Sequence, residues 1–379
     1  MFKIFPIAMT LVCVTLFADV FSPSSKKKEK CSTDFHQGDE ALPTCIPEGY
    51  SPSAITKLKR DDAASDVFFD FSFLYYYASL DGLSLANNRV ALPGGTTVSP
   101  PAYGQVISQS FGYSPAFKVG LGAVFEEWEV SGQYIWIRQT QNMHKNAPPL
   151  EVGAESGSVS VWDAENWFYP PLLLGKFYGN RISSEWQLGM DIGDLTASSP
   201  YYQGRKSIIL PFFGLRTAWI RNSLDIHMPL PLLTGNPLGV SKNQSHAWLL
   251  GPRFGGEFHC LLGAGTRIQG TIAAAALYTA FTLVEHYEYV TNYSPAIREK
   301  FPSTISTLTP ELELSLGTGW GMYLGGEAYH LDVSANYDFL VFWNQNVMRQ
   351  LLDAAFSSTG SSSGNLYLQG LNIMAKVDF

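Results

Sequence analysis

The stretch from Thr309 to Val341 reads TPELELSLGTGWGMYLGGEAYHLDVSANYDFLV. On each side of the Gly325-Gly326 pair, apolar residues alternate with small, polar or acidic residues over roughly ten positions. Because successive side chains of a β-strand point to opposite faces, this pattern predicts a hairpin with one apolar and one polar face. Such a hairpin fits either a soluble sandwich with an apolar core or an outer-membrane barrel, whose apolar face meets lipid and whose polar face meets a wet lumen.

The composition favours the barrel. The chain has 379 residues, of which 46% are hydrophobic and 14% aromatic, with 34 glycines. A helical membrane protein would carry spans of about 20 apolar residues, and no such span follows the N-terminal region. The net charge of -8 argues against nucleic acid as a partner.

The N-terminus has the pattern of an export signal over residues 1–18. Lys3 precedes an apolar segment at 4–17, and Ala18 is a suitable cleavage residue, so the mature chain is expected to begin near Asp19. A membrane anchor is the alternative interpretation. Residues 19–65 show no periodicity and are predicted to be a flexible extension, in which Cys31 and Cys45 could pair in an oxidising compartment.

Ten strands are predicted within residues 66–379. They lie at about 67–78, 115–125, 128–138, 182–192, 206–219, 247–259 and 266–280, in the two arms of the opening hairpin, and at about 365–379. Short and long connections alternate between them, which is typical of an antiparallel outer-membrane barrel with short periplasmic turns, long extracellular loops and an even number of strands. Further strands in 139–181, 193–205 or 220–230 would raise the count to twelve or more.

The alternation assigns a set of charged side chains to the lumen. The predicted pore-lining residues are Asp70, Lys118, Glu129, Glu185, Asp191, Arg216, Arg253, Glu257, Arg267, Glu311, Glu313, Asp332, Asp338 and Lys376. In one interpretation they set a field that filters solutes in a water-filled lumen. In the other they pair across a narrow barrel and close it, because ten strands leave little more room than the side chains need.

No enzyme signature is present in the sequence. It contains no GxSxG, HExxH or Walker motif and no paired CxxC, so no catalytic, cofactor or metal site is predicted. His330 and Asp332 lie on one face of a predicted strand near its periplasmic end. We interpret them as a hydrogen-bonded lumen pair rather than a catalytic pair.

Four segments carry a resemblance to a known family. They are GPRFGGEF from Gly251, ILPFFGLRTAWI from Ile209, LELSLGTGWGMYL from Leu312 and HLDVSANYDFLVFWNQN from His330. Residues 66–379 resemble the Legionella-type major outer membrane protein family, which also occurs in environmental chlamydiae. The resemblance implies a bacterial outer-membrane β-barrel regarded as a porin, through which small solutes diffuse passively. The alternative is a structural or adhesive barrel with a closed lumen and functional surface loops.

The terminal strand ends in an aromatic residue, with Phe379, Val377 and Ile373 on one face. The resemblance implies that these residues act as the signal read by the barrel-assembly machinery. The other expected partners are outer-membrane lipid and small solutes, and a homo-oligomer is left open.

Overall fold

Residues 66–91, 98–99, 104–125, 128–149, 156–164, 167–168, 178–203, 207–232, 234–301, 305–324, 329–349 and 363–379 are described in a computed structural model. The predicted signal peptide, the extension and the Cys31–Cys45 pair lie outside these residues. Within them, no helix is long and apolar enough to cross a membrane.

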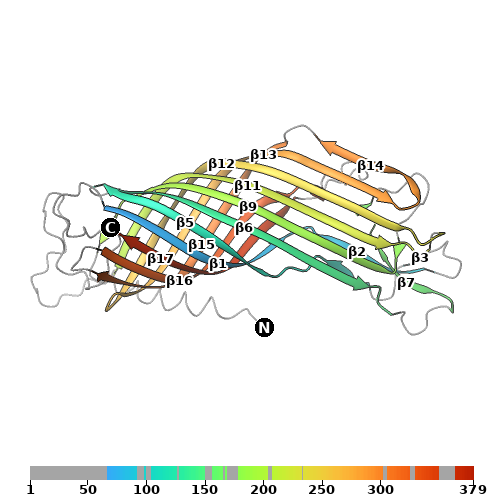
Figure 1. The fold of residues 1–379 in the computed structure, drawn as a ribbon, viewed down its shortest axis with the longest axis horizontal. Helices are drawn as coiled ribbons and strands as arrows, with labels where there is room; N and C mark the ends of the chain where they lie inside the picture. The colour runs from blue at the N-terminus through green and yellow to red at the C-terminus, as the bar shows by residue number, and fades with distance from the viewer. Residues whose placement is uncertain are drawn as a thin grey trace, which may run out of the picture. The chain divides into compact units, whose positions relative to one another are not determined.

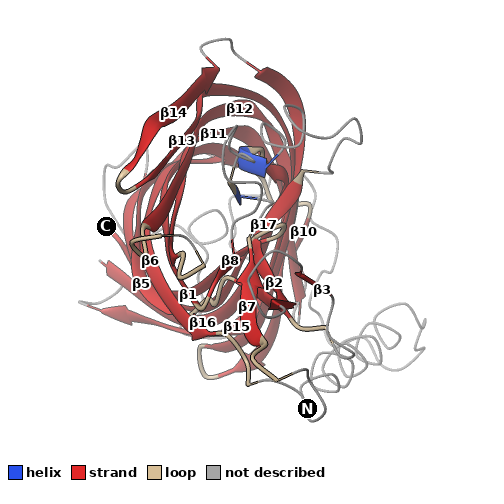
Figure 2. Ribbon diagram, turned by 90° about the vertical axis from the view of Figure 1, so that its right-hand side faces the viewer, coloured by secondary structure: helices blue, strands red, loops and turns tan. Residues whose placement is uncertain are grey.

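Ten antiparallel strands form a closed barrel, as the sequence predicts (Figures 1 and 2). They are β1 (Asp66–Leu80), β5 (Tyr113–Phe125), β6 (Trp128–Asn146), β9 (Arg181–Ser198), β11 (Ser207–Pro229), β12 (Leu238–Gly263), β13 (Thr266–Val290), β15 (Ile305–Leu324), β16 (Tyr329–Asn346) and β17 (Gly364–Asp378). The last strand pairs with the first, and β9 pairs with β11, so the wall has no open edge. Closure is required because unpaired backbone groups cannot be left in lipid.

The remaining strands do not widen the barrel. The short strand β10 (Tyr202–Gln203) pairs with β11, and β14 (Tyr293–Phe301) pairs with β13. A separate five-stranded sheet contains β2 (Ser84–Ala91), β3 (Val98–Ser99), β4 (Val106–Ser108), β7 (Val159–Asp163) and β8 (Tyr178–Gly179). The possible extra strands in 139–181, 193–205 and 220–230 are therefore continuations of barrel strands, short accessory strands or connections.

Two predicted long connections are extended β-structure instead. The segment at 220–245 belongs largely to β11 and β12, which meet around residues 230–237, and β13 continues to Val290 before β14 returns along it. In Figure 1 these long strands and the small sheet lie at the end opposite the C-terminus. The turn at 264–265, the end of β5 and the start of β16 lie at the C-terminal end, which is the periplasmic end of such a barrel.

The side-chain pattern inverts along the long strands. In the lower part of β11, Phe213 and Leu215 are exposed on the outside, while Arg216 faces inward. Beyond Trp219 the outward positions become polar, starting with Arg221, and the inward ones become apolar: Ile220, Leu224, Ile226 and Met228. The physical reason is a change of surroundings: lipid outside the lower part demands apolar residues, and water outside the upper part demands polar ones.

This inversion corrects the prediction for β9. Trp186, Leu188, Met190 and Ile192 were expected to face lipid, but they are at most 2% exposed and point into the barrel. Glu185 and Asp191, predicted to line the pore, lie on the outer face, where Asp191 pairs with Trp136 of the neighbouring strand. The prediction assumed that this strand is embedded in the membrane, where apolar residues face outward. This part of β9 lies beyond the inversion, where apolar residues face inward.

Candidate functional site: the barrel interior

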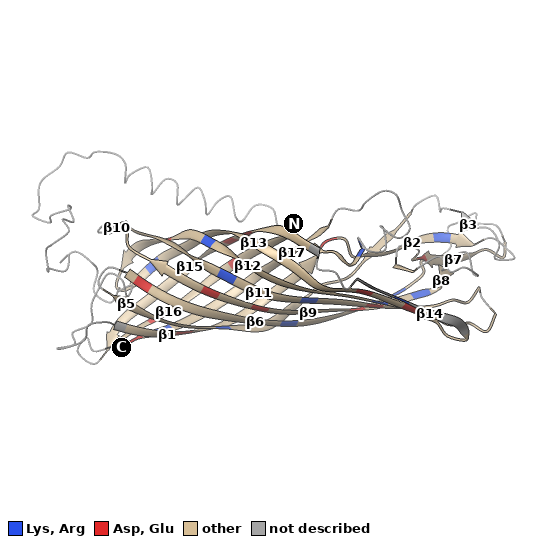
Figure 3. Ribbon diagram, turned by 90° about the horizontal axis from the view of Figure 1, so that it is seen from above, with Lys and Arg blue, Asp and Glu red and all other residues tan. Residues whose placement is uncertain are grey.

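The interior face carries every predicted pore-lining residue except Glu185 and Asp191. The strand registers place Asp70, Lys118, Glu129, Arg216, Arg253, Glu257, Arg267, Glu311, Glu313, Asp332, Asp338 and Lys376 on it. Figure 3 marks charged positions in the barrel wall and in the strands beyond it. The prediction missed Asp194, because its segment was assigned to a connection.

A central ion-pair cluster crosses the middle of the interior. It consists of Arg216, Asp194, Glu311, Glu313 and Arg253. Arg216 is 1% exposed and donates from Nε and Nη2 to the two Asp194 oxygens, at 2.7 and 2.6 Å. Its guanidinium also binds Glu311 and, at 2.9 Å, Glu313, which accepts a further hydrogen bond from Arg253 at 2.8 Å. Since a buried charge is costly unless it is paired and hydrogen-bonded, these contacts explain how five titratable side chains lie together here.

A second ion pair passes over β15 nearer the periplasmic end. Arg267 on β13 donates to both oxygens of Asp332 on β16, at 2.5 and 2.7 Å. Gly319 of β15 lies beneath this pair, and a Cβ there would be only 2.6 Å from Arg267 Cζ. The absence of a side chain at this position is therefore what lets the guanidinium cross the strand.

Asp338 gathers three hydrogen bonds on the same interior surface. It accepts from the Tyr76 hydroxyl at 2.6 Å, from Ser315 at 2.6 Å and from Asn372 at 2.8 Å.

The predicted hydrogen bond between His330 and Asp332 is wrong, although both side chains are interior. His330 Nδ1 lies 3.0 Å from Asp378, and Asp332 binds Arg267, so the two side chains have different partners.

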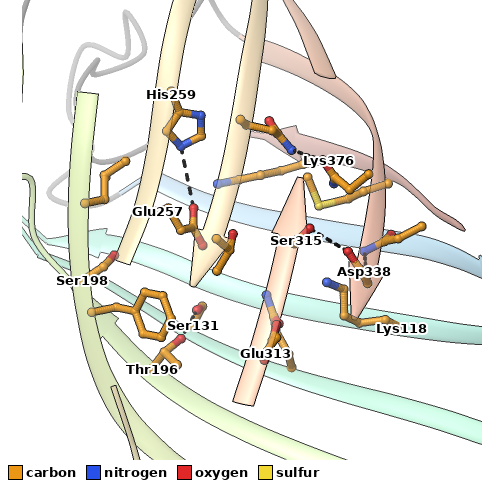
Figure 4. A pocket seen from close by; sticks show the side chains of 18 of the residues that line it. Lys118, Ser131, Thr196, Ser198, Glu257, His259, Glu313, Ser315, Asp338 and Lys376 are labelled. Atoms are coloured by element: carbon orange, nitrogen blue, oxygen red, sulfur yellow. Dashed lines mark hydrogen bonds and ion pairs between the residues drawn. The ribbon is translucent and has the colours of Figure 1, made fainter. Parts of the chain in front are cut away.

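A polar cavity of about 190 Å³ lies among these groups in the periplasmic half. Figure 4 shows that Lys118, Glu257, His259, Glu313 and Lys376 converge on it from several strands. Lys376, which lines it, makes only long ion pairs: its Nζ is 3.9 Å from Glu129 and 3.7 Å from Asp378. The cavity can hold water and small polar solutes. Among the described residues, no group of three or more His, Cys, Asp or Glu side chains could hold a metal ion.

The outer half of the interior is lined mainly by apolar side chains, with buried polar residues such as Asn243, Thr279 and His286 among them. Its wall is formed by buried side chains that include Leu74, Ile137, Met190, Ile192, Ile220, Leu249, Leu277, Leu340 and Leu368. Trp186 of β9 is fully buried among them. Counted over the residues that the structure describes, nine of the ten barrel strands, all except β15, contribute to this cluster, so the polar cavity is followed outward by a largely apolar layer.

Side chains from three connections fill the space inside this wall. We call them the outer plug: Leu83, Leu85, Trp162, Trp167, Phe168, Val347 and Met348, which belong to the same buried cluster. None of these residues was predicted to have a role, because their connections show no strand periodicity. The only signal was the aromatic content of the segment at 162–168.

Buried hydrogen bonds hold the connections to the wall. Trp167 donates its indole N–H to the Ser84 carbonyl at 2.7 Å, and its own carbonyl accepts from Ser241 of β12 at 2.6 Å. Ser184 of β9 donates to Gln109 at 2.6 Å, and the Gln109 amide donates to the Gln141 carbonyl of β6 at 3.1 Å. Breaking a buried hydrogen bond leaves a desolvated polar group, so these bonds fix the position of the plug.

The terminal strand is fixed along its whole length. Val377 faces Phe69 and Ile373 faces Phe73 on β1, with all four side chains on the lipid-facing surface. Phe379 donates its N–H to the Val67 carbonyl at 2.8 Å and accepts from the Val67 N–H at 3.0 Å. The proposed assembly signal is therefore also the seam at which the barrel closes.

Several solved structures have some similarity to the chain. The outer membrane protease OmpT of Escherichia coli is 10% identical, with 86% of this chain and 99% of that one covered and a TM-score of 0.35. A FadL homologue of Pseudomonas aeruginosa is 8% identical over 86% and 91% of the chains, with a TM-score of 0.24. The toluene transporter TodX of Pseudomonas putida is 8% identical over 89% and 93%, with a TM-score of 0.19.

No curated protein matches the sequence. The model of one protein family, described as the Legionella pneumophila major outer membrane protein precursor, matches residues 68–379. This match spans all ten barrel strands apart from the first two residues of β1. The chain is thus a bacterial outer-membrane β-barrel, and it belongs to the family of the Legionella pneumophila major outer membrane protein.

Proposed function

We propose that the protein is a closed outer-membrane barrel that acts through its extracellular β-structure, as a structural and adhesive surface protein. The observation that carries this proposal is the buried, largely apolar layer with its plug in the outer half of the interior. Conduction needs a continuous path of water, and moving an ion or polar solute into a packed apolar layer is strongly unfavourable. The central ion-pair cluster leaves less room for water to pass through the interior, because its side chains reach across the lumen and bind one another.

The outward-reaching strands supply the functional surface in this proposal. The ends of β11, β12 and β13, together with β14 and the small sheet, lie at the end opposite the C-terminus (Figure 1). Their outward side chains include Asp225 on β11 and Lys242 on β12, and the neighbouring strand β9 adds Glu185. Such strands project a rigid surface away from the membrane. We propose no catalytic activity, because the sequence contains no enzyme signature.

Liposome swelling tests the closed lumen. The purified, refolded protein is compared with a variant in which residues 82–110 are replaced by a short Gly-Ser linker, which is feasible because Tyr77 and Tyr113 face each other on adjacent strands. We expect arabinose uptake only with the variant. A second variant shortened at the tip of β13–β14, outside the plug, is the control and should stay impermeable. Rapid uptake with the wild type would overturn the proposal.

A porin-like channel for passive diffusion of small solutes is the second candidate. The polar cavity of about 190 Å³ and the charges around it favour this function, as does the resemblance from which it was predicted. In this case the outer plug would have to leave the barrel for a solute to pass. Swelling by the wild type, with no effect of removing residues 82–110, would favour the porin.

A further inference from the structure

We propose that the outer surface of the barrel carries a binding site for a phosphate group of the outer-leaflet glycolipid. A hollow of about 380 Å³ lies on the outward face of β6, β9, β11 and β12, separate from the barrel interior. We call it the outer-face groove and define it by Arg138, Gly189, Arg221 and His246. No sequence signal singled it out, because Gly189 was assigned to the lumen, Arg221 and His246 fell outside the predicted strands, and Arg138 was the last residue of one.

The four defining residues form one row across four strands. Arg138 faces Gly189, Gly189 faces Arg221, and Arg221 faces His246. A Cβ at Gly189 would lie 3.7 Å from Arg138 Cδ and 3.8 Å from Arg221 Cβ. Because Gly189 has no side chain, the space between the aliphatic parts of the two arginines stays open. The amide side chains of Gln187 and Gln244 border this space.

The two arginines differ in how they are held. Arg138 donates to both Asp191 oxygens at 2.8 and 2.9 Å and to the carbonyls of Ile137 and Met190 at 2.7 and 2.9 Å. It also lies 5.1 Å from the centre of the Trp136 ring. Arg221, by contrast, is exposed and makes no hydrogen bond or ion pair with any residue in the described part of the chain. The groove thus combines a fixed guanidinium with one whose donors remain available for an anion.

The position of the groove selects the kind of anion. In the next row toward the periplasm, Asp191 faces Trp136 on one side and Trp219 on the other, and Trp219 faces Trp248. Tryptophans gather at membrane–water interfaces, and below them Leu215 and Leu250 are exposed to lipid. The groove therefore lies at headgroup level in the outer leaflet, where the glycolipid carries phosphates on its sugars and its acyl chains can cover the apolar belt. Basic pockets at this level are suited to anionic headgroups.

Native mass spectrometry of the refolded protein in detergent tests the site. The probes are lipid A carrying both phosphates and the same lipid A after enzymatic dephosphorylation. We expect the phosphorylated form to bind about tenfold more tightly, and Arg221→Gln to remove that preference, because hydrogen bonds to charged groups are among the stronger ones. Gly189→Ala keeps both charges but fills the space between the two arginines, so it should weaken binding by a smaller factor. Heat-modifiable migration in gels verifies that each variant is folded.

Arg298→Gln is the matched control. Arg298 is an exposed arginine on β14 that pairs with Glu285 at 2.5 Å, away from the groove. Its replacement removes the same charge and should leave lipid A binding unchanged. Equal affinity for the two lipid A forms, or equal losses in the Arg221 and Arg298 variants, would overturn the proposal. Glucosamine 1-phosphate that binds as tightly as lipid A would assign the groove to a soluble phosphate and so refute the lipid ligand.

Discussion

Arg216 on β11 binds Glu311 on β15 across the barrel interior, past the intervening strands β12 and β13. Both side chains are almost completely buried, at 1% and 0% exposed. This contact ties together parts of the wall that do not hydrogen-bond to each other. It also places a bound ion pair where an open channel would need water.

Replacing Arg216 tests how much this cluster contributes to stability. Arg216→Met leaves the carboxylates of Asp194, Glu311 and Glu313 buried without their main partner, so we expect a loss of about 3–5 kcal/mol in the free energy of unfolding. The measurement is guanidinium-induced unfolding of the refolded barrel in detergent. Arg138→Met, which removes a partly exposed ion pair on the outer face, should cost about 1 kcal/mol or less. Equal losses would mean that the buried cluster has no special role.

Gly319 is expected to be intolerant of any side chain. In Gly319→Ala the new Cβ would collide with the Arg267 guanidinium and displace it from Asp332, at a cost of about 1–3 kcal/mol. Gly189→Ala is the matched control, because its Cβ would make only ordinary contacts at 3.7 Å. Unfolding midpoints of the two variants provide the comparison. A Gly319 variant as stable as the Gly189 variant would show that Arg267 does not cross β15 in this way.

Cysteine labelling tests the inverted face of β9. Gln187→Cys lies on the exposed face and should react with a membrane-impermeant maleimide on intact cells, whereas Leu188→Cys lies in the buried interior and should react only after unfolding. The sequence-based assignment, in which the apolar side of this strand faces lipid, predicts that Gln187→Cys points into the barrel. A Gln187→Cys variant that stays unlabelled on intact cells would contradict the inverted face.

The strand pattern shows what the sequence could and could not provide. All ten barrel strands follow from the alternation of apolar and polar residues along the sequence. Alternation cannot tell which face is outward once a strand leaves the membrane, and this is why Glu185 and Asp191 were misplaced. The outer plug could not be predicted either, because Leu83, Trp167 and Met348 come from connections without periodicity and meet only in the folded barrel.

The end of the chain is predicted to matter more for assembly than for stability. Deleting Phe379 removes two backbone hydrogen bonds to Val67 at the rim but leaves the rest of the β1–β17 register intact. Refolded protein should therefore lose little equilibrium stability, while the amount of heat-modifiable protein inserted in cells should fall sharply. Phe379→Tyr keeps an aromatic end and should insert normally. Full insertion of the deletion variant would leave Phe379 only a structural role at the interface.

Single-channel recording in planar lipid bilayers tests the closed lumen most directly. The wild-type barrel should show no steady conductance in 1 M KCl, because the apolar layer and the outer plug interrupt the path of water. The variant with residues 82–110 replaced by a short linker should show stable channel steps under the same conditions. Steady, uniform conductance steps from the wild-type protein would contradict the closed barrel and identify a channel.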